Sequence, residues 1–107
     1  MKFRIYLVAL LATAGMAAAD HVTYRSSVRL QGRPDLQTMH GLTRISLLQA
    51  AQSAQKAAPR AKLVEVELEN EDGNVVYKVK LLDGTNLRKM VIDAGNASVL
   101  ANRLDVH

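Results

Sequence analysis

Residues 64–82 alternate apolar and charged side chains on both sides of an Asp-Gly turn, and this pattern constrains the fold more than any other feature. The first half alternates Val64, Val66 and Leu68 with Glu65, Glu67 and Glu69. The second half alternates Val75, Tyr77, Val79 and Leu81 with Val76, Lys78, Lys80 and Leu82. A period of two places each set on one face of a strand, so the segment is predicted to be a β-hairpin that turns near Asp72-Gly73.

The position of this turn also predicts the register of the hairpin. Three apolar pairs are expected to face the core: Leu68 with Tyr77, Val66 with Val79, and Val64 with Leu81. Two charged pairs are expected on the other face: Glu67 with Lys78, and Glu65 with Lys80. These pairs fix the register, because a slip of one residue would carry the apolar side chains into solvent.

An amphipathic helix is predicted before the hairpin, beginning at Ser46. The Ser46 hydroxyl can accept a hydrogen bond from the Gln49 amide while the Gln49 side chain reaches back, which is a capping box. The following apolar positions share one helical face: Leu47, Ala50, Ala51, Ala54 and Ala58. Pro59 disfavours the helical conformation at Ala58, so the helix is expected to end there.

Two further strands are expected after the hairpin. The first is Leu87–Asp93, with Met90 and Ile92 facing the core, and the second is the short segment Ser98–Leu100. The predicted fold class is therefore α+β, with one helix packed on a three- to four-stranded antiparallel sheet, and this domain is assigned to residues 45–101.

The first residues have the features of a secretory signal peptide. Lys2 and Arg4 form a basic region, Ile5–Ala14 is apolar, and Ala17–Ala19 supplies a cleavage site of small residues. Residues 1–19 are thus assigned to a signal peptide and the protein to the periplasm or the cell exterior. The alternative is an uncleaved leader that anchors the chain, although a membrane span needs roughly 20 apolar residues. With no cysteine in the sequence, neither a lipoprotein anchor nor a disulfide is expected.

Residues 20–44 are expected to form an N-terminal arm, flexible or loosely packed on the domain, and residues 102–107 a polar tail. The arm carries Arg25, Arg29 and Arg33 at four-residue spacing, a pattern that can contact an anionic lipid or an acidic partner. A solubilising arm is the alternative interpretation, since the composition does not favour a helix there. A formal net charge of only +4 argues against a nucleic-acid-binding function.

The domain resembles the PepSY family. The residues that carry the resemblance are Ala50, Ala54, Pro59, Gly73, Tyr77, Val79, Ile92, Asp93 and Ala94, and it extends from Ile45 to Leu100. Most of these family positions are expected to be structural, with Tyr77 a core residue bonded at its hydroxyl. The chain departs from the family before the last strand, where members often have Thr-Gly and this sequence has Asn96-Ala97.

The resemblance implies an extracytoplasmic α+β module, found in propeptides of thermolysin-type metallopeptidases and as small stand-alone exported proteins. It implies a non-catalytic binding or regulatory role, modulating a peptidase or a membrane sensor of the envelope, without a cofactor. The sequence itself also argues against an enzyme, because it lacks cysteine and its histidines, His21, His40 and His107, lie in the arm or at the last position.

The alternative function is a small periplasmic protein that binds a metal ion or ligand. Cleavage after Ala19 would place a free α-amine on Asp20 beside the His21 imidazole, and such nitrogen ligands suit Cu(II) or Ni(II). The acidic residues of the hairpin could serve as a cation site, but pairing with Lys78 and Lys80 explains their spacing without chemistry.

Overall fold

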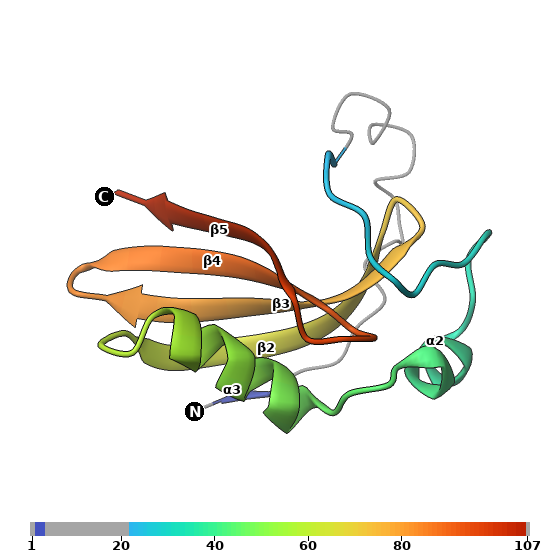
Figure 1. The fold of residues 1–107 in the computed structure, drawn as a ribbon, viewed down its shortest axis with the longest axis horizontal. Helices are drawn as coiled ribbons and strands as arrows, with labels where there is room; N and C mark the ends of the chain where they lie inside the picture. The colour runs from blue at the N-terminus through green and yellow to red at the C-terminus, as the bar shows by residue number, and fades with distance from the viewer. Residues whose placement is uncertain (1, 4–21, 107) are drawn as a thin grey trace.

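The computed structural model describes residues 2–3 and 22–106. Its strands are β1 (Lys2–Phe3), β2 (Lys62–Glu71), β3 (Asn74–Asp83), β4 (Asn86–Asp93) and β5 (Val99–Asp105), and its helices are α2 (Leu36–Leu42) and α3 (Leu47–Ala57). β2 to β5 form an antiparallel meander, and β1 joins the outer edge of β2 in parallel. α3 lies across one face of this sheet (Figure 1). The predicted α+β class, a helix packed on a four-stranded antiparallel sheet, is confirmed.

The β2–β3 hairpin turns at Asp72 and Gly73, which both have positive φ, 54° and 87°. Two positive φ values in a two-residue loop match the right-handed twist of the strands, and Asp-Gly is a preferred pair for such a turn. Four of the predicted pairings are confirmed: Leu68 with Tyr77, Val66 with Val79, Glu67 with Lys78 and Glu65 with Lys80.

The predicted pairing of Val64 with Leu81 is wrong. The register shifts between Leu63 and Glu65, and Leu63 instead lies opposite Leu81. Such a shift adds one residue to β2, and the Val64 side chain is left 40 % exposed.

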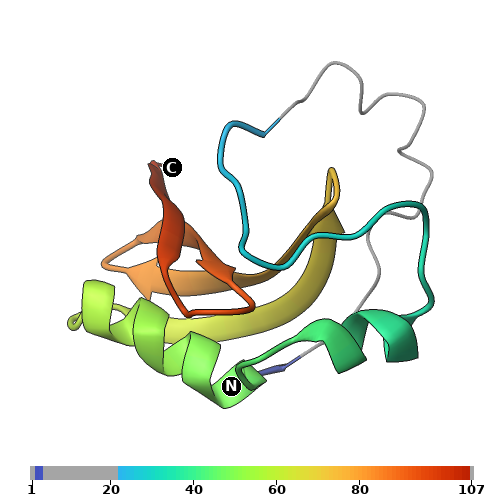
Figure 2. The ribbon, with the colours of Figure 1, turned by 45° about the vertical axis from the view of Figure 1, so that its right-hand side comes forward.

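α3 begins with the predicted capping box. Ser46 Oγ accepts a hydrogen bond from the Gln49 amide at 3.1 Å, and Gln49 Oε1 accepts one from the Ser46 amide at 2.8 Å. The face toward the sheet is buried at Ala50, Ala51 and Ala54. Because alanine is small, α3 can approach the sheet closely and bury the apolar side chains between the two layers: Val66, Leu68, Tyr77, Val79, Leu81, Met90 and Ile92. Figure 2 shows this two-layer arrangement, with the N-terminal arm passing beside the β2–β3 turn.

Two elements differ from the sequence predictions. α2 forms inside the arm, where no helix is expected: Asp35 caps it by accepting a hydrogen bond from the Thr38 amide at 2.7 Å, and Met39 is its buried residue. A helix that buries one side chain has no apolar period to detect. β5 continues to Asp105, so residues 102–105 of the expected tail belong to the sheet, where they pair with β4.

The turn before β5 contains Ala97 with a φ of 67°, a conformation that favours glycine. Ala97→Gly is expected to raise the free energy of unfolding by about 0.5 kcal/mol, because relief of the left-handed strain slightly exceeds the added entropy of the unfolded chain. Urea unfolding followed by circular dichroism would measure the difference, and a clear loss of stability would contradict this account of the turn.

Candidate binding face

The face of the sheet turned away from α3, called here the outer face, carries rows of charged side chains. Its members are Glu65, Glu67, Glu69 and Glu71 on β2, Val76, Lys78 and Lys80 on β3, Lys89 and Val91 on β4, and Ala101 and Arg103 on β5. Strand alternation places these residues together, since every second residue of a strand points to the same face. The face is therefore acidic along β2 and mainly basic across β3, β4 and β5, where Asp105 of β5 is an acidic exception.

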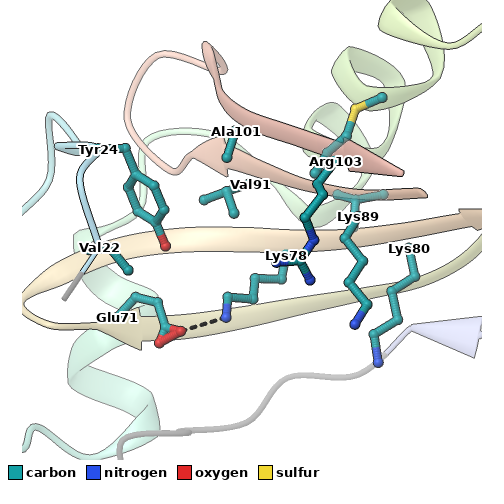
Figure 3. Close-up of a pocket in the computed structure, with 11 residues that line it drawn as sticks. Val22, Tyr24, Glu71, Lys78, Lys80, Lys89, Val91, Ala101 and Arg103 are labelled. Atoms are coloured by element: carbon teal, nitrogen blue, oxygen red, sulfur yellow. Dashed lines mark hydrogen bonds and ion pairs between the residues drawn. The ribbon is translucent and has the colours of Figure 1, made fainter. Parts of the chain in front are cut away.

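The N-terminal arm covers one end of the outer face. Val22 and Tyr24 lie against Val91 and Ala101, with Glu71 and Lys78 beside them, and together with Lys80, Lys89 and Arg103 they line a groove of ≈ 270 Å³ (Figure 3). Burial, followed by the nearby charges of Glu71, Glu69 and Asp72, raises the pKa of Tyr24 well above its ordinary value. Its hydroxyl is thus protonated at physiological pH, and the groove combines an apolar floor with a charged rim.

Asp93, at the end of β4, anchors the arm. Its carboxylate accepts hydrogen bonds from the Ser27 amide at 2.7 Å, the Ser27 hydroxyl at 2.7 Å and the Gly95 amide at 2.7 Å. A fourth, longer bond comes from the amide of Asn96 at 3.3 Å. Burial would raise the pKa of Asp93, which is only 2 % exposed, but these hydrogen bonds outweigh it and hold the pKa below 3.8. The charged form of Asp93 therefore stabilises the docked arm.

Further contacts tie the arm to the β2–β3 hairpin. Asn74 Oδ1 accepts hydrogen bonds from the Ser26 amide at 2.8 Å and from Arg29 Nη1 at 2.6 Å, and Ser26 Oγ donates to the Val75 carbonyl at 2.8 Å. The backbone of Val28 accepts from the Val75 amide at 2.9 Å. These contacts hold the arm from Ser26 to Arg29 at the end of the sheet.

Gly95 gives independent support for this close approach of the arm. A Cβ added to Gly95 would lie 2.2 Å from Ser27 Oγ and 2.8 Å from Val28 Cγ2. Both distances are shorter than real Cβ contacts, so a side chain at position 95 would force the Ser27 and Val28 side chains to move out of their present positions.

Two ion pairs on the outer face bridge neighbouring strands, and a third lies within β5. Lys80 Nζ lies 3.3 Å from Glu65 Oε1, Lys89 Nζ lies 3.0 Å from Asp105 Oδ2, and Arg103 Nε lies 2.9 Å from Asp105 Oδ1. Such partly exposed pairs contribute little to stability. They do hold the long basic side chains in place along the groove.

Glu69 is buried on the outer face, as Glu65 and Glu67 are, and it differs from them in having a carboxyl oxygen without a hydrogen bond. It is 4 % exposed, and its Oε1 lies 3.2 Å from Lys78 Nζ but has no hydrogen-bond partner. The Lys78 ammonium donates its hydrogen bond to Glu71 instead (Figure 3). Burial, with the neighbouring Glu67 carboxyl, outweighs Lys78 and raises the pKa of Glu69 from 4.5 to about 8. Glu69 is therefore mainly protonated at neutral pH in the folded protein.

Most of the family positions singled out in the sequence lie in the core rather than on this face. Ala50, Ala54, Tyr77, Val79, Ile92 and Ala94 are buried between α3 and the sheet. Tyr77 is 1 % exposed, and its hydroxyl donates to the Ile45 carbonyl at 2.9 Å, as expected of a core tyrosine. Pro59 follows the end of α3 and Gly73 forms the hairpin turn. Asp93 is the exception, because it binds the arm.

The other candidate residues are placed less favourably for the roles considered. Arg25, Arg29 and Arg33 are exposed on a non-helical part of the arm, so four-residue spacing does not align them on one face there, and Arg29 contacts Asn74. Asp20 and His21 lie outside the described residues, as does the expected signal peptide apart from Lys2 and Phe3.

Neither a metal-binding cluster nor a membrane-spanning helix occurs among the described residues. Residues 2–3 and 22–106 contain no group of three or more His, Asp or Glu arranged to hold a metal ion. His40, the histidine within these ranges, is exposed on α2 and does not line the groove. No helix in this part of the chain is both long and apolar enough to cross a membrane.

Sequence reasoning missed the residues that build the groove and hold the arm, above all Tyr24, Ser26, Ser27 and Asn74. One usable signal was available: Asp93 is a charged residue that ends an apolar strand, two positions before Gly95. A buried aspartate must find hydrogen-bond donors, and it finds them in the arm.

Comparisons with known proteins agree with this domain assignment. The family model of the PepSY domain, described as peptidase propeptide and YPEB domain, matches residues 44–103. This range contains α3, β2, β3, β4 and most of β5, and it leaves the arm as far as Thr43 outside. No catalytic family was identified. No curated protein and no solved structure was found to be similar to the chain.

Proposed function

The chain belongs to the PepSY family, and from that premise we propose that it is a non-catalytic binding module of the cell envelope that holds a protein partner, a peptidase or a membrane sensor, on the outer face of its sheet. PepSY domains are generally non-catalytic and typically extracytoplasmic. The sequence features of a signal peptide support the same location. The part of the proposal that goes beyond the family is the place of contact.

The observation that carries this proposal is the groove between Tyr24 and the outer face. The arm is held there by a buried, fully hydrogen-bonded aspartate, and it supplies an aromatic ring over an apolar floor. Aromatic and arginine side chains around a concave apolar patch are the common components of protein-binding surfaces. The charged side chains around the groove, such as Glu71 and Arg103, would set the specificity and rate of association rather than supply most of the affinity.

A capture experiment from the envelope fraction tests the proposal. The immobilised full chain is expected to recover one dominant protein in stoichiometric amount, identified by mass spectrometry as a peptidase or a membrane sensor. The double variant Lys89→Glu, Arg103→Glu is expected to reduce recovery by about tenfold, because it reverses the charge of the groove rim. Lys56→Glu, on the solvent side of α3, is the matched control and should recover as much as the unmodified chain.

Two results would contradict the proposal. The first is recovery of no stoichiometric partner from an envelope fraction in which the chain is folded by circular dichroism. The second is equal recovery by the groove variant and the α3 control, since binding would then not involve the outer face.

A further inference from the structure

β2 is the edge strand of the meander, and its outer edge already accepts another strand. Lys2 and Phe3 of β1 pair in parallel with Glu65 and Val66. Within the described ranges, β1 pairs with two positions of a strand ten residues long, so an added strand would replace β1 at Glu65 and Val66 or pair with the positions beyond them. A strand edge presents backbone N–H and C=O groups that can pair with any extended chain of suitable side chains. The outer edge of β2 therefore has the backbone geometry that an added strand requires.

The side chains along this edge define which chain would fit. The outer face of β2 has carboxyl groups at Glu65, Glu67 and Glu69, which are 8 %, 6 % and 4 % exposed, and its other face has Val66 and Leu68 in the core. An added strand would place alternate side chains beside each of these two rows, because opposite residues of paired strands share a face. The fitting segment alternates basic and apolar residues.

The charge balance favours such a segment over a second copy of this chain. Glu65, Glu67, Glu69 and Glu71 stand against two ammonium groups, Lys78 and Lys80, and the row stays negative even with Glu69 protonated. Two copies joined through the same edge would bring two acidic rows together, which is destabilising. A basic segment would instead reduce the repulsion within the row.

We propose that the outer edge of β2 binds an extended segment of the protein partner, in which basic and apolar residues alternate, as an added strand of the sheet. The backbone hydrogen bonds supply affinity and the glutamate row supplies selectivity. This inference rests on the proposed function, and it gives the partner a second point of contact, on the strand next to the groove.

A peptide-binding experiment on the full chain tests the inference. The probe is a short fluorescent peptide in which lysine and valine alternate, followed by fluorescence anisotropy. A block peptide of the same composition, with all lysines before all valines, is expected to bind about tenfold more weakly, because it cannot place lysines on one face. The alternating peptide with every second backbone amide methylated should bind as weakly, since it cannot complete the strand hydrogen bonds.

Variants of the chain locate the contact. Glu65→Gln combined with Glu67→Gln is expected to weaken binding of the alternating peptide by about tenfold, while Asp105→Asn, at the opposite edge of the same face, leaves it within about twofold. Equal binding of the alternating, block and methylated peptides would overturn the inference, because attraction would then be electrostatic alone. So would an equal loss in the Asp105→Asn variant. A third outcome separates the two proposals. If the alternating peptide does not bind while capture of the envelope partner still depends on the groove, strand addition is wrong and the proposed function stands.

Discussion

Replacing Asp93 with asparagine is expected to lower the free energy of unfolding by about 3 kcal/mol and to release the N-terminal arm. The carboxylate accepts hydrogen bonds from Ser27, Gly95 and Asn96 in a buried position. Asparagine keeps one acceptor oxygen and turns two N–H donors toward groups that are themselves donors. Hydrogen bonds to a charged group contribute about 1.5–3 kcal/mol each, and buried donors left without a partner add a desolvation cost.

Urea unfolding followed by circular dichroism measures the stability, and limited trypsin digestion measures the arm. Cleavage after Arg29 is expected to be fast in Asp93→Asn and slow in the unmodified chain, because a docked backbone does not fit a protease site. Asp83→Asn is the matched control: it removes a partly exposed carboxylate that pairs with Arg88 at 2.8 Å, and it should change stability by less than about 1 kcal/mol. Unchanged stability and unchanged cleavage in Asp93→Asn would contradict the anchoring role.

Two further observations separate anchoring from a general loss of stability. Gly95→Ala leaves Asp93 intact but places a Cβ against Ser27, so it should also expose Arg29 to trypsin. Because the pKa of Asp93 is held below its ordinary value of 3.8, its contribution is present above that pH and is lost as the pH falls through the lower folded-state pKa. Release of the arm in the unmodified chain is thus expected only at strongly acidic pH.

Replacing Glu69 with glutamine is expected to remove a loss of stability that the unmodified chain shows between about pH 4.5 and pH 8. In that range the folded state holds the Glu69 proton and the unfolded state has lost it, so the free energy of unfolding falls as the pH rises. At about 1.4 kcal/mol per pKa unit, a displacement from 4.5 to about 8 corresponds to a few kcal/mol. Glutamine is neutral at every pH and has nearly the shape of the protonated acid.

Thermal unfolding at a series of pH values checks this prediction. The melting temperature of the unmodified chain should decrease from pH 5 to about pH 8.5, and that of Glu69→Gln should stay nearly constant over the same range. Glu65→Gln is the control on the same strand and face, and because Glu65 pairs with Lys80 it should retain the dependence of the unmodified chain. A parallel decrease in the Glu69→Gln variant would show that another group causes it.

The sequence predicted the parts of the fold whose signal is local and periodic. The alternation across Asp72-Gly73 specified the hairpin and most of its register, and Ser46 with Gln49 specified the start of α3. The bulge at Val64 was not predictable, since an alternating pattern does not show where one residue is inserted. Residues 102–105 join β5 through backbone pairing with β4, which polar side chains do not reveal.

The candidate site was largely hidden from the sequence because its contacts join distant segments. Ser27 and Asp93 are 66 positions apart, and neither residue type alone indicates a partner. The sequence pattern does not predict the order of the arm, because that order comes from hydrogen bonds to the sheet rather than from a period of its own. Arg29 bonds to Asn74 of the same chain, a contact that its sequence spacing does not indicate, and the predicted partner contact of Arg29 stays a prediction.

Site-specific photo-crosslinking in cells tests the central claim, that a protein partner binds on the outer face beside the arm. A photoreactive residue would replace Tyr24, which lines the groove, or, as the matched control, Leu48, which is 59 % exposed on α3. The account predicts one crosslinked envelope protein from position 24 and none from position 48. Crosslinking of that protein from position 48 alone, or from neither position, would contradict the account.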